Sequence, residues 1–156
     1  MKIIRLFTLM SATTFVFATF GVSARADDAP PPDGWQSVMP LLAKADVDAG
    51  KKLAQACAMC HSLEKGGGTK MGPDLFNIVD RQRASTEGFP YSNAMKAFHD
   101  KKWSYETLDQ FLFNPRAAVP GTRMSYPGMK ETHKRAELIA FLRTLADKPA
   151  ALPKVK

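Results

Sequence analysis

Between residues 46 and 146 the hydrophobic positions follow a helical period, and no stretch shows a convincing strand pattern. One helix is predicted over residues 105–113, because its apolar residues share one face: Leu108, Phe111 and Leu112. Ser104 can cap its start, and Asn114 before Pro115 ends it.

Helices are also predicted at the two ends of this region. Asp46 can cap a helix that runs toward Cys57, and Gly50 inside it indicates that another element comes too close for a side chain. Thr132 can cap the last helix, whose apolar residues follow the i, i+3, i+4, i+7 rule: Leu138, Phe141, Leu142 and Leu145. A weaker helix is predicted over residues 92–98.

Glycines and prolines between these helices predict long loops. A few short helices joined by long loops bury too little apolar surface by themselves, so a large flat apolar cofactor would supply the missing core. We therefore predict an all-α fold of three to five helices wrapped around such a group.

The two ends of the chain are typical of accessory segments. Residues 1–26 have a basic start, an apolar run and the sequence Ala24-Arg25-Ala26, which predicts a secretory signal peptide. An uncleaved membrane anchor is the alternative, because the apolar run is nearly long enough to span a bilayer. Residues 27–45 form a Pro- and Ala-rich extension expected to pack loosely or stay mobile, with a docking segment for a partner as the alternative, and residues 147–156 form a second tail.

The charge is only mildly basic once the signal peptide is removed. The whole chain has 22 basic and 15 acidic residues, a formal charge of +7. Lys2, Arg5 and Arg25 leave with residues 1–26, so 19 basic and 15 acidic residues remain, a charge of +4. These charges stand singly or in pairs, which argues against nucleic-acid binding and favours a basic face toward an acidic protein partner.

The chain's only two cysteines stand in Cys57-Ala58-Met59-Cys60-His61, the C-x-x-C-H pattern of c-type haem attachment. One helical turn sets both sulfurs on the same side, where each can form a thioether with a haem vinyl group. His61 then points at the iron. Export agrees with this interpretation, because haem c is attached outside the cytoplasm, and we predict one covalent haem c as the cofactor.

Three other uses of the same pentapeptide stay open at this point. A thioredoxin-like redox pair would follow a strand in a βαβ pattern, and no such strand precedes Cys57. A structural zinc site would need a second ligand pair, whereas His99 and His133 are far apart in the sequence. A structural disulfide would leave His61 unexplained.

The pentapeptide is one of a series of short patterns that follow the order of a known family. The patterns are Cys57-Ala-Met-Cys-His61, Glu64-Lys-Gly-Gly67, Gly72-Pro-Asp-Leu75, Gly88-Phe-Pro-Tyr91, Trp103, Asn114-Pro115, Pro120-Gly-Thr-Arg-Met124 and Glu137-Leu-Ile-Ala-Phe-Leu142. With them, residues 46–146 resemble class I cytochrome c, meaning mitochondrial cytochrome c and its soluble bacterial relatives. The resemblance implies the small cytochrome c fold, in which the first and last helices cross, here with Gly50 facing Phe141.

The resemblance also implies the ligands of the iron, which are His61 and Met124. Of the eight methionines, only Met124 lies in the Pro-Gly-Thr-x-Met loop. A His/Met pair raises the reduction potential, and filling both axial positions closes the iron to substrates. The carbonyl of Pro73 would accept a hydrogen bond from His61, which fixes the ring and strengthens it as a donor.

Further site residues come from the same resemblance. Four match positions that hydrogen-bond or neutralise the haem propionates: Arg81, Tyr91, Ser92 and Trp103. Thr122 matches a residue near the inner propionate. Phe111 and Met95 replace polar residues of the mitochondrial pattern, which predicts a drier haem pocket with a shifted potential, and Ala54 replaces an aromatic residue of the first helix.

The function implied by the resemblance is that of a periplasmic electron carrier of the respiratory chain, with no catalytic residues. It would shuttle single electrons between a reductase or dehydrogenase and an acceptor such as an oxidase. Basic residues would steer this monomer to redox partners with acidic docking surfaces. Four match positions that ring the haem edge in relatives, Lys70, Arg116, Arg123 and Lys130, and Lys51 and Lys52 stand close by.

Two alternatives to the general carrier stay open. The first is a haem enzyme or gas-binding sensor, peroxidase-like, with a displaceable sixth ligand. No His or Glu stands beside Met124 to serve it as an acid–base group. The second is an electron acceptor dedicated to one periplasmic dehydrogenase, which would use the same fold and the same haem edge.

Overall fold

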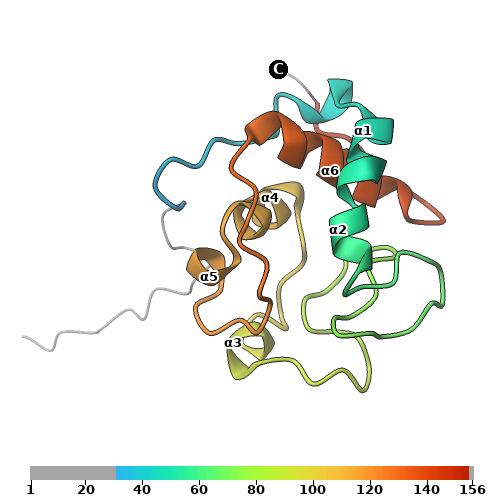
Figure 1. Cartoon of the computed structure of the whole chain (residues 1–156), viewed down its shortest axis with the longest axis vertical. Helices are drawn as coiled ribbons and strands as arrows, with labels where there is room; N and C mark the ends of the chain where they lie inside the picture. Colours follow the sequence, from blue (N-terminus) through green and yellow to red (C-terminus); the bar gives the residue numbers. More distant parts are fainter. Residues whose placement is uncertain (1–30, 155–156) are drawn as a thin grey trace, which may run out of the picture.

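The computed structural model describes residues 31–154, and Figure 1 shows their path. The predicted signal peptide, residues 27–30 of the extension and residues 155–156 of the last tail lie outside the described residues. Helices form the upper part of the view, where α1 and α6 lie across one another. Long loops form most of the lower part, around the short α3.

The described residues contain helices and loops, and no strand. The helical elements are η2 (Leu42–Lys44), α1 (Val47–Leu53), α2 (Gln55–Ala58), α3 (Asn93–Lys96), α4 (Tyr105–Phe113), α5 (Pro115–Ala118) and α6 (Thr132–Thr144). Gln82 and Lys102 form one isolated antiparallel bridge. The prediction of a mostly helical fold with long loops is confirmed.

Local capping explains where the main helices begin. The carboxylate of Asp46 accepts hydrogen bonds from two backbone N–H groups in the first turn of α1, and the hydroxyl of Ser104 caps α4 by accepting one, from the N–H of Thr107. Both predicted caps are confirmed. The predicted cap at Thr132 is wrong, because α6 begins at Thr132 itself and Glu131 holds the cap position. The carboxylate of Glu131 instead pairs with Lys134 at 2.9 Å.

One turn of helix was missed after α4. Asn114 and Pro115 end α4 as expected, but the same two residues also begin α5. The side-chain oxygen of Asn114 accepts a hydrogen bond from the backbone N–H of Ala117 at 3.2 Å. Proline is well suited to the first helical position, where its missing N–H costs nothing.

The close approach that Gly50 predicts occurs between α1 and α6. A Cβ atom built on Gly50 would lie 2.0 Å from the carbonyl oxygen of Glu137 and 2.9 Å from the Cβ of Phe141. No side chain fits that space, so glycine lets the two helix backbones touch. The apolar face of α6 is buried beneath this crossing, with Leu138 and Ile139 almost fully inaccessible.

The N-terminal extension is not loose where the structure describes it. Val38 is 0% exposed and Leu42 is 2% exposed, and both belong to the same hydrophobic core as α4 and α6. The expectation of a loosely packed or mobile tail is therefore wrong for this part of residues 27–45. Burial of two aliphatic side chains stabilises such a segment by roughly 3 kcal/mol.

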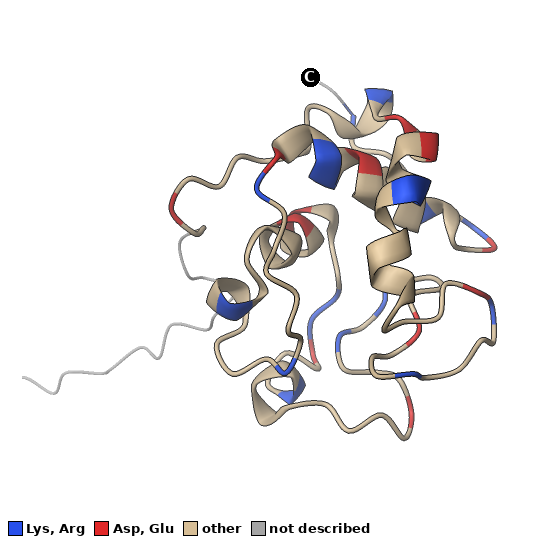
Figure 2. Ribbon diagram, viewed as in Figure 1, with Lys and Arg blue, Asp and Glu red and all other residues tan. Residues whose placement is uncertain are grey.

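Charged residues are distributed over the whole described chain. Figure 2 shows basic segments on α1, α3, α5 and α6 and on several loops. Within residues 31–154 no helix is long and apolar enough to cross a membrane.

Candidate haem site

The two cysteines and His61 share one helical turn. Cys57 lies in α2, and its carbonyl oxygen accepts from the backbone N–H groups of Cys60 at 3.0 Å and His61 at 2.9 Å. The helical path therefore continues past α2 through the pentapeptide. Both cysteines are free and half-buried, and burial raises the pKa of the Cys57 thiol. Two neighbouring free thiols on one turn are the arrangement that thioether attachment requires.

The ring of His61 is held in one tautomer by the backbone. Its Nδ1 lies 2.6 Å from the carbonyl oxygen of Pro73, and because a carbonyl can only accept, Nδ1 carries the proton. In a neutral imidazole the lone pair on Nε2 is then available to a metal. Burial lowers the pKa of His61, which favours this neutral form.

Gly72 shapes the same side of the site. A Cβ at this position would lie 2.3 Å from Cε1 of His61, so glycine makes room for the imidazole. The backbone N–H of Gly72 donates to the carbonyl of Cys60 at 2.8 Å. The Gly72-Pro73 pair thus packs directly against the attachment turn, as the order of the sequence patterns predicts.

Met124 lies in the loop between α5 and α6, residues 119–130, which we call the ligand loop. Met124 is half-buried and packs against the hydrophobic core. Its backbone N–H donates to the hydroxyl of Thr122 at 3.3 Å, so Thr122 shapes the backbone around the methionine. The guanidinium of Arg123 donates to the carbonyls of Pro90 and Tyr91 at 2.7 and 3.0 Å and ties this part of the loop to the segment before α3.

Arg81 is engaged by its own chain. Its guanidinium donates to the carboxylate of Asp74 at 3.2 Å, to the backbone carbonyl of Asp74 at 2.6 Å and to that of Phe76 at 3.0 Å. The ion pair with Asp74 is about four-fifths buried. The side chain is thereby fixed beside the segment that carries Pro73, and its predicted contact with a propionate stays a prediction.

The other three predicted propionate residues have structural roles of their own. Ser92 caps α3 by accepting from the N–H of Met95 at 3.1 Å. The hydroxyl of Tyr91 accepts from the N–H of Thr86 at 3.4 Å. Trp103 is buried, with its ring 5.0 Å from that of Phe111. Their contact with the haem propionates stays a prediction.

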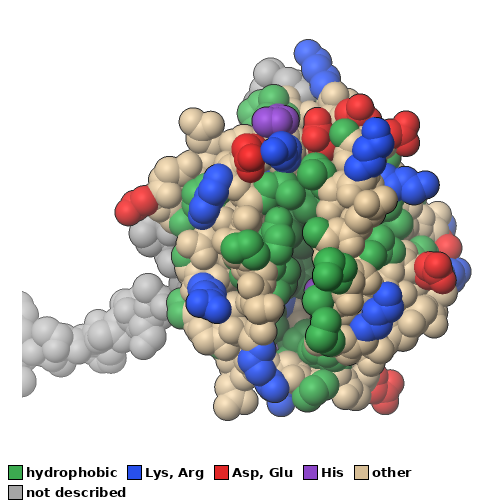
Figure 3. Space-filling model, in the orientation of Figure 1, with side chains coloured by type: hydrophobic (Ala, Val, Ile, Leu, Met, Phe, Trp, Pro, Cys, Tyr) green, Lys and Arg blue, Asp and Glu red, His purple; other side chains and the backbone are tan. Residues whose placement is uncertain are grey.

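The surface is hollowed between the attachment turn and the ligand loop. Figure 3 shows a groove lined by hydrophobic side chains, with α2 on one side and the chain that leads into α6 on the other. A flat apolar group fits such a groove, since it would cover apolar surface that otherwise faces water. The residues present therefore fit a haem attached to Cys57 and Cys60, with His61 and the ligand loop on opposite sides.

Basic side chains border the groove. Figure 3 shows Lys or Arg on both sides of it, and five of the six basic residues predicted for docking are exposed with no ion pair among the described residues: Lys51, Lys52, Lys70, Arg116 and Arg123. Three of the six donate to backbone carbonyls: Lys70 to Ala58 at 3.1 Å, Arg123 to Pro90 and Tyr91, and Lys130 to Phe113 at 2.9 Å. Lys130 differs from the others in that its Nζ also lies 3.8 Å from the centre of the Phe113 ring.

A buried ion pair near the base of the ligand loop was not predicted. Arg135 of α6 donates from Nε to the carboxylate of Asp109 in α4 at 2.5 Å, and both side chains are 0% exposed. Burial raises the pKa of Asp109, although Arg135 and the N–H of Val38 act in the opposite direction. A signal did exist in the sequence, because each charge lies on the apolar face of its helix.

The fold and the site together define a class of protein: a small, all-α protein with a c-type haem attachment turn at one wall of an apolar groove. The chain belongs to the Cytochrome c family, whose family model matches residues 47–146. The family implies haem c at Cys57 and Cys60.

Relatives from bacteria and plants agree with this assignment. The chain is 42% identical over 101 residues to "Cytochrome c" of Ginkgo biloba, covering 63% of this chain and 87% of that protein. It is 38% identical over 114 residues to "Cytochrome c homolog" of Bradyrhizobium diazoefficiens, covering 72% of this chain and 61% of the longer relative.

A solved structure supports the fold directly. Cytochrome cH from Methylobacterium extorquens superposes with a TM-score of 0.59 at 32% sequence identity. The match covers 64% of this chain and 99% of that protein. The prediction of a small cytochrome c fold is confirmed.

Proposed function

We propose that this protein is a periplasmic electron carrier that shuttles single electrons through one haem c, attached at Cys57 and Cys60 and ligated by His61 and Met124. It takes electrons from a reductase or dehydrogenase and passes them to a terminal acceptor such as an oxidase. It is exported by residues 1–26 and acts as a monomer, without catalytic residues. Membership of the Cytochrome c family supports the carrier role.

The observation that carries the proposal is the hydrogen bond between His61 and Pro73. At 2.6 Å it fixes the imidazole with Nε2 free, and it increases the basicity of the ring as a metal ligand. The bond comes from a backbone carbonyl, so it does not depend on a mobile side chain. A ligand that is held in one orientation changes little when the oxidation state changes, which suits fast electron transfer.

Each part of the chain has a defined task in this proposal. When bound, haem c supplies an iron that changes its oxidation state by one electron. Cys57 and Cys60 would retain the group, His61 and Met124 would ligate its iron, and the apolar groove would exclude water. Arg81, Tyr91, Ser92, Trp103 and Thr122 would hold the propionates. A closed, rigid site of this kind favours electron transfer over binding of substrates.

Docking to partners uses the basic residues beside the groove. Exposed lysines and arginines on both of its sides favour an acidic partner surface and a transient, fast encounter. Lys130 contributes less than the resemblance suggests, because its Nζ both donates to the carbonyl of Phe113 and lies 3.8 Å from the centre of the Phe113 ring. The remaining candidates are Lys51, Lys52, Lys70, Arg116 and Arg123.

Salt dependence tests the docking. The rate at which the reduced protein reduces an oxidase should fall as salt is added, and Lys70→Glu should lower the rate at low salt at least about tenfold. Lys148→Glu, in the last tail, makes the same change of net charge and should have a much smaller effect. A rate that does not depend on salt would refute docking by charge.

Phe111 and Met95 support a drier pocket with a shifted potential. Both are buried, at 7% and 8% exposure, and neither side chain can donate a hydrogen bond. The reduction potential of a haem responds to such groups and to burial. A redox titration of the double variant Phe111→Tyr, Met95→Asn should give a changed potential, and an unchanged potential would refute the idea.

Partner identity decides between a general carrier and a dedicated acceptor. Isolation of the protein that reduces this one in its own host separates the two, because a dedicated acceptor would have one dehydrogenase as its donor.

Binding of carbon monoxide to the reduced protein tests the enzyme or sensor alternative. A closed His/Met site should bind it only slowly in the reduced protein, whereas a displaceable sixth ligand would allow fast binding.

A further inference from the structure

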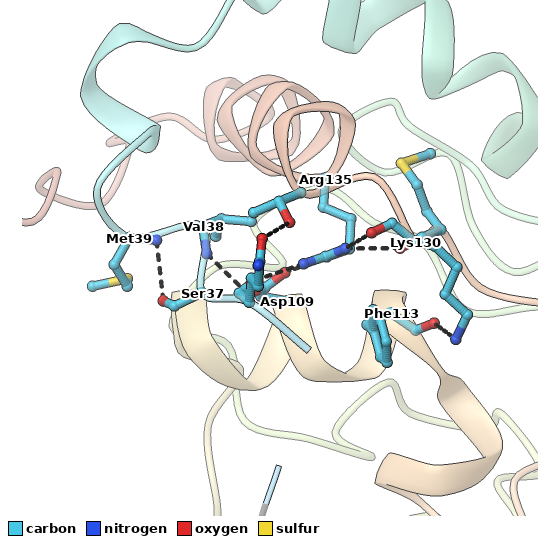
Figure 4. A network of polar contacts seen from close by, with 10 residues as sticks. Ser37, Val38, Met39, Asp109, Phe113, Lys130 and Arg135 are labelled. Carbon is cyan, nitrogen blue, oxygen red and sulfur yellow. Dashed lines mark hydrogen bonds and ion pairs between the residues drawn. The ribbon is translucent and has the colours of Figure 1, made fainter. Parts of the chain in front are cut away.

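The buried ion pair between Asp109 and Arg135 joins four parts of the chain that are far apart in sequence. Figure 4 shows the network. Arg135 comes from α6 and Asp109 from α4, and the two other parts are the ligand loop and residues 35–38 of the N-terminal extension, which we call the strap. None of the residues in this network belongs to the attachment turn or is a proposed iron ligand.

The strap closes the ion pair from one side. The backbone N–H of Val38 donates to the carboxylate of Asp109 at 3.1 Å, while Arg135 donates from one terminal nitrogen to the carbonyl of Gln36 at 2.7 Å. Val38 is 0% exposed, as are both charged side chains. The strap therefore supplies one hydrogen bond to each ion and keeps water away from the pair.

The other end of the Arg135 guanidinium holds the ligand loop. Its second terminal nitrogen donates to the carbonyls of Met129 and Lys130 at 3.0 and 2.8 Å. Two further bonds fix the same stretch to the end of α4: the N–H of Met129 donates to the carbonyl of Leu112 at 2.8 Å, and Lys130 donates to that of Phe113 at 2.9 Å. These contacts lie five and six residues after Met124.

We propose that the strap is a positioning element for the axial ligand Met124, and that it acts through Arg135 on the base of the ligand loop. A guanidinium has a rigid planar fork, so partners that fix one edge also fix the direction of the other. Without the strap, water reaches the pair and competes for the same donors, which weakens the hold on Met129 and Lys130. The loop then opens more often.

This inference rests on the proposed function only in taking Met124 as an iron ligand. The coupling between strap and loop can be measured without that assumption. Amide hydrogen exchange reports opening of a segment whatever the segment binds. Failure of the ligand assignment and failure of the coupling are therefore distinguishable.

The main test is a deletion with a matched control, both expressed behind the same residues 1–26 and studied as the haem-loaded protein. Deletion of residues 27–38 removes the strap, and deletion of residues 27–31 leaves it in place together with the bond from the N–H of Trp35 to the carbonyl of Pro32. Amide exchange in peptides that cover residues 124–131 should become at least about fivefold faster in the first variant and stay unchanged in the second. Exchange in α1 should change less than about twofold.

A milder pair of variants covers the case in which the deletion does not fold. Val38→Ala loosens the strap at a fully buried position, and Leu41→Ala changes an exposed side chain, 41% accessible, a few residues further on. Loop exchange should be faster in the first variant and normal in the second. Equal acceleration of α1 and the loop, or less than a twofold change in the loop with both the deletion and Val38→Ala, would overturn the proposal.

The variant Arg135→Lys tests whether the strap acts on the ligand loop through Arg135. Lysine keeps the positive charge but lacks the fork that reaches the strap and the loop together. If the strap acts through Arg135, its deletion in the lysine variant should add less than about twofold to the loop exchange. If the strap deletion and Arg135→Lys accelerate loop exchange by factors that multiply in full, the strap does not act through Arg135. Weakening of the thioether-to-iron(III) charge-transfer band in parallel with loop exchange would tie the effect to Met124.

Discussion

The crossing of α1 and α6 and the ligand loop are held in place by different kinds of contact. At the crossing, backbone meets backbone over Gly50, and fully buried aliphatic side chains such as Ile139 fill the space beneath. The ligand loop is held mainly by polar contacts near its two ends, and Met124 between them is only half-buried. The packing at the crossing is complete with atoms of the protein chain alone.

The difference shows that one region of this small protein can serve as a rigid support while the other needs the cofactor to complete its contacts. The helical crossing has its partner atoms within the chain, so it can form a rigid support. The loop borders the apolar groove of Figure 3, where the haem would supply the missing contacts. A site whose last contacts come from the cofactor depends on anchors at its base, such as Gly128, Lys130 and Arg135.

Gly50→Ala should have the largest effect. In an exposed helix this change stabilises by about 1 kcal/mol, but here the new Cβ would lie 2.0 Å from the Glu137 carbonyl. We expect the free energy of unfolding to fall by about 3 kcal/mol, because α1 and α6 must move apart. Lys51→Ala, on the same helix at an exposed position, is the control for urea denaturation. A stabilised Gly50→Ala variant would show that the crossing is not tight.

Gly128→Ala tests the anchor of the ligand loop. Gly128 has φ of +94°, and a Cβ would lie 2.3 Å from the carbonyl oxygen of Phe113. Strain and the clash together should lower the free energy of unfolding by about 2 kcal/mol. Gly88→Ala is the matched control, since Gly88 has φ of +70° with open space around it, and should lose only about 1 kcal/mol. Equal losses in the two variants would mean that the contact with Phe113 carries no energy.

Lys130→Met should have a smaller effect on the same anchor. The change removes the hydrogen bond to Phe113 and the contact with its ring, and we expect a loss of about 1 kcal/mol in urea denaturation. Lys134 forms an exposed ion pair with Glu131, so Lys134→Met should cost less than about 0.5 kcal/mol. Were the two losses the same, Lys130 would be an ordinary surface lysine.

The smallest expected effect is a fall in the free energy of unfolding at alkaline pH, caused by a buried tyrosine in the helical region. Burial raises the pKa of Tyr105, whose hydroxyl donates to the carbonyl of Ala150. Above about pH 10 the unfolded chain loses this proton before the folded chain does, so stability falls as pH rises toward the folded pKa. Denaturation of Tyr105→Phe between neutral and alkaline pH should show a shallower fall. An unchanged slope would contradict this contribution.

The sequence was sufficient where the determinants are local. Helix α4 begins and ends where Ser104 and Asn114 predict, because a cap and a proline act within a few residues of themselves. Gly50 indicated a close approach, since a buried glycine inside a helix needs a reason. The order of the motifs around Cys57 and Met124 was enough to predict the fold.

Long-range docking could not be predicted in the same way. The N-terminal extension looks like a tail because residues 27–45 are rich in proline and alanine, yet the N–H of Val38 in its strap donates to Asp109, 71 positions away. Arg135 and Asp109, taken one at a time, each have the appearance of a surface charge. Only their place on the apolar faces of α6 and α4 indicated that two opposite charges would have to meet in the core.

The central claim is that His61 and Met124 close both axial positions of one haem c, and one spectrum tests it most directly. The ferric protein should show the thioether-to-iron charge-transfer band, which Met124→Ala should abolish. Met71→Ala, at a position that is 75% exposed, should leave the band unchanged. A band that survives in Met124→Ala would contradict the ligand assignment and, with it, the closed site on which the electron-carrier proposal depends.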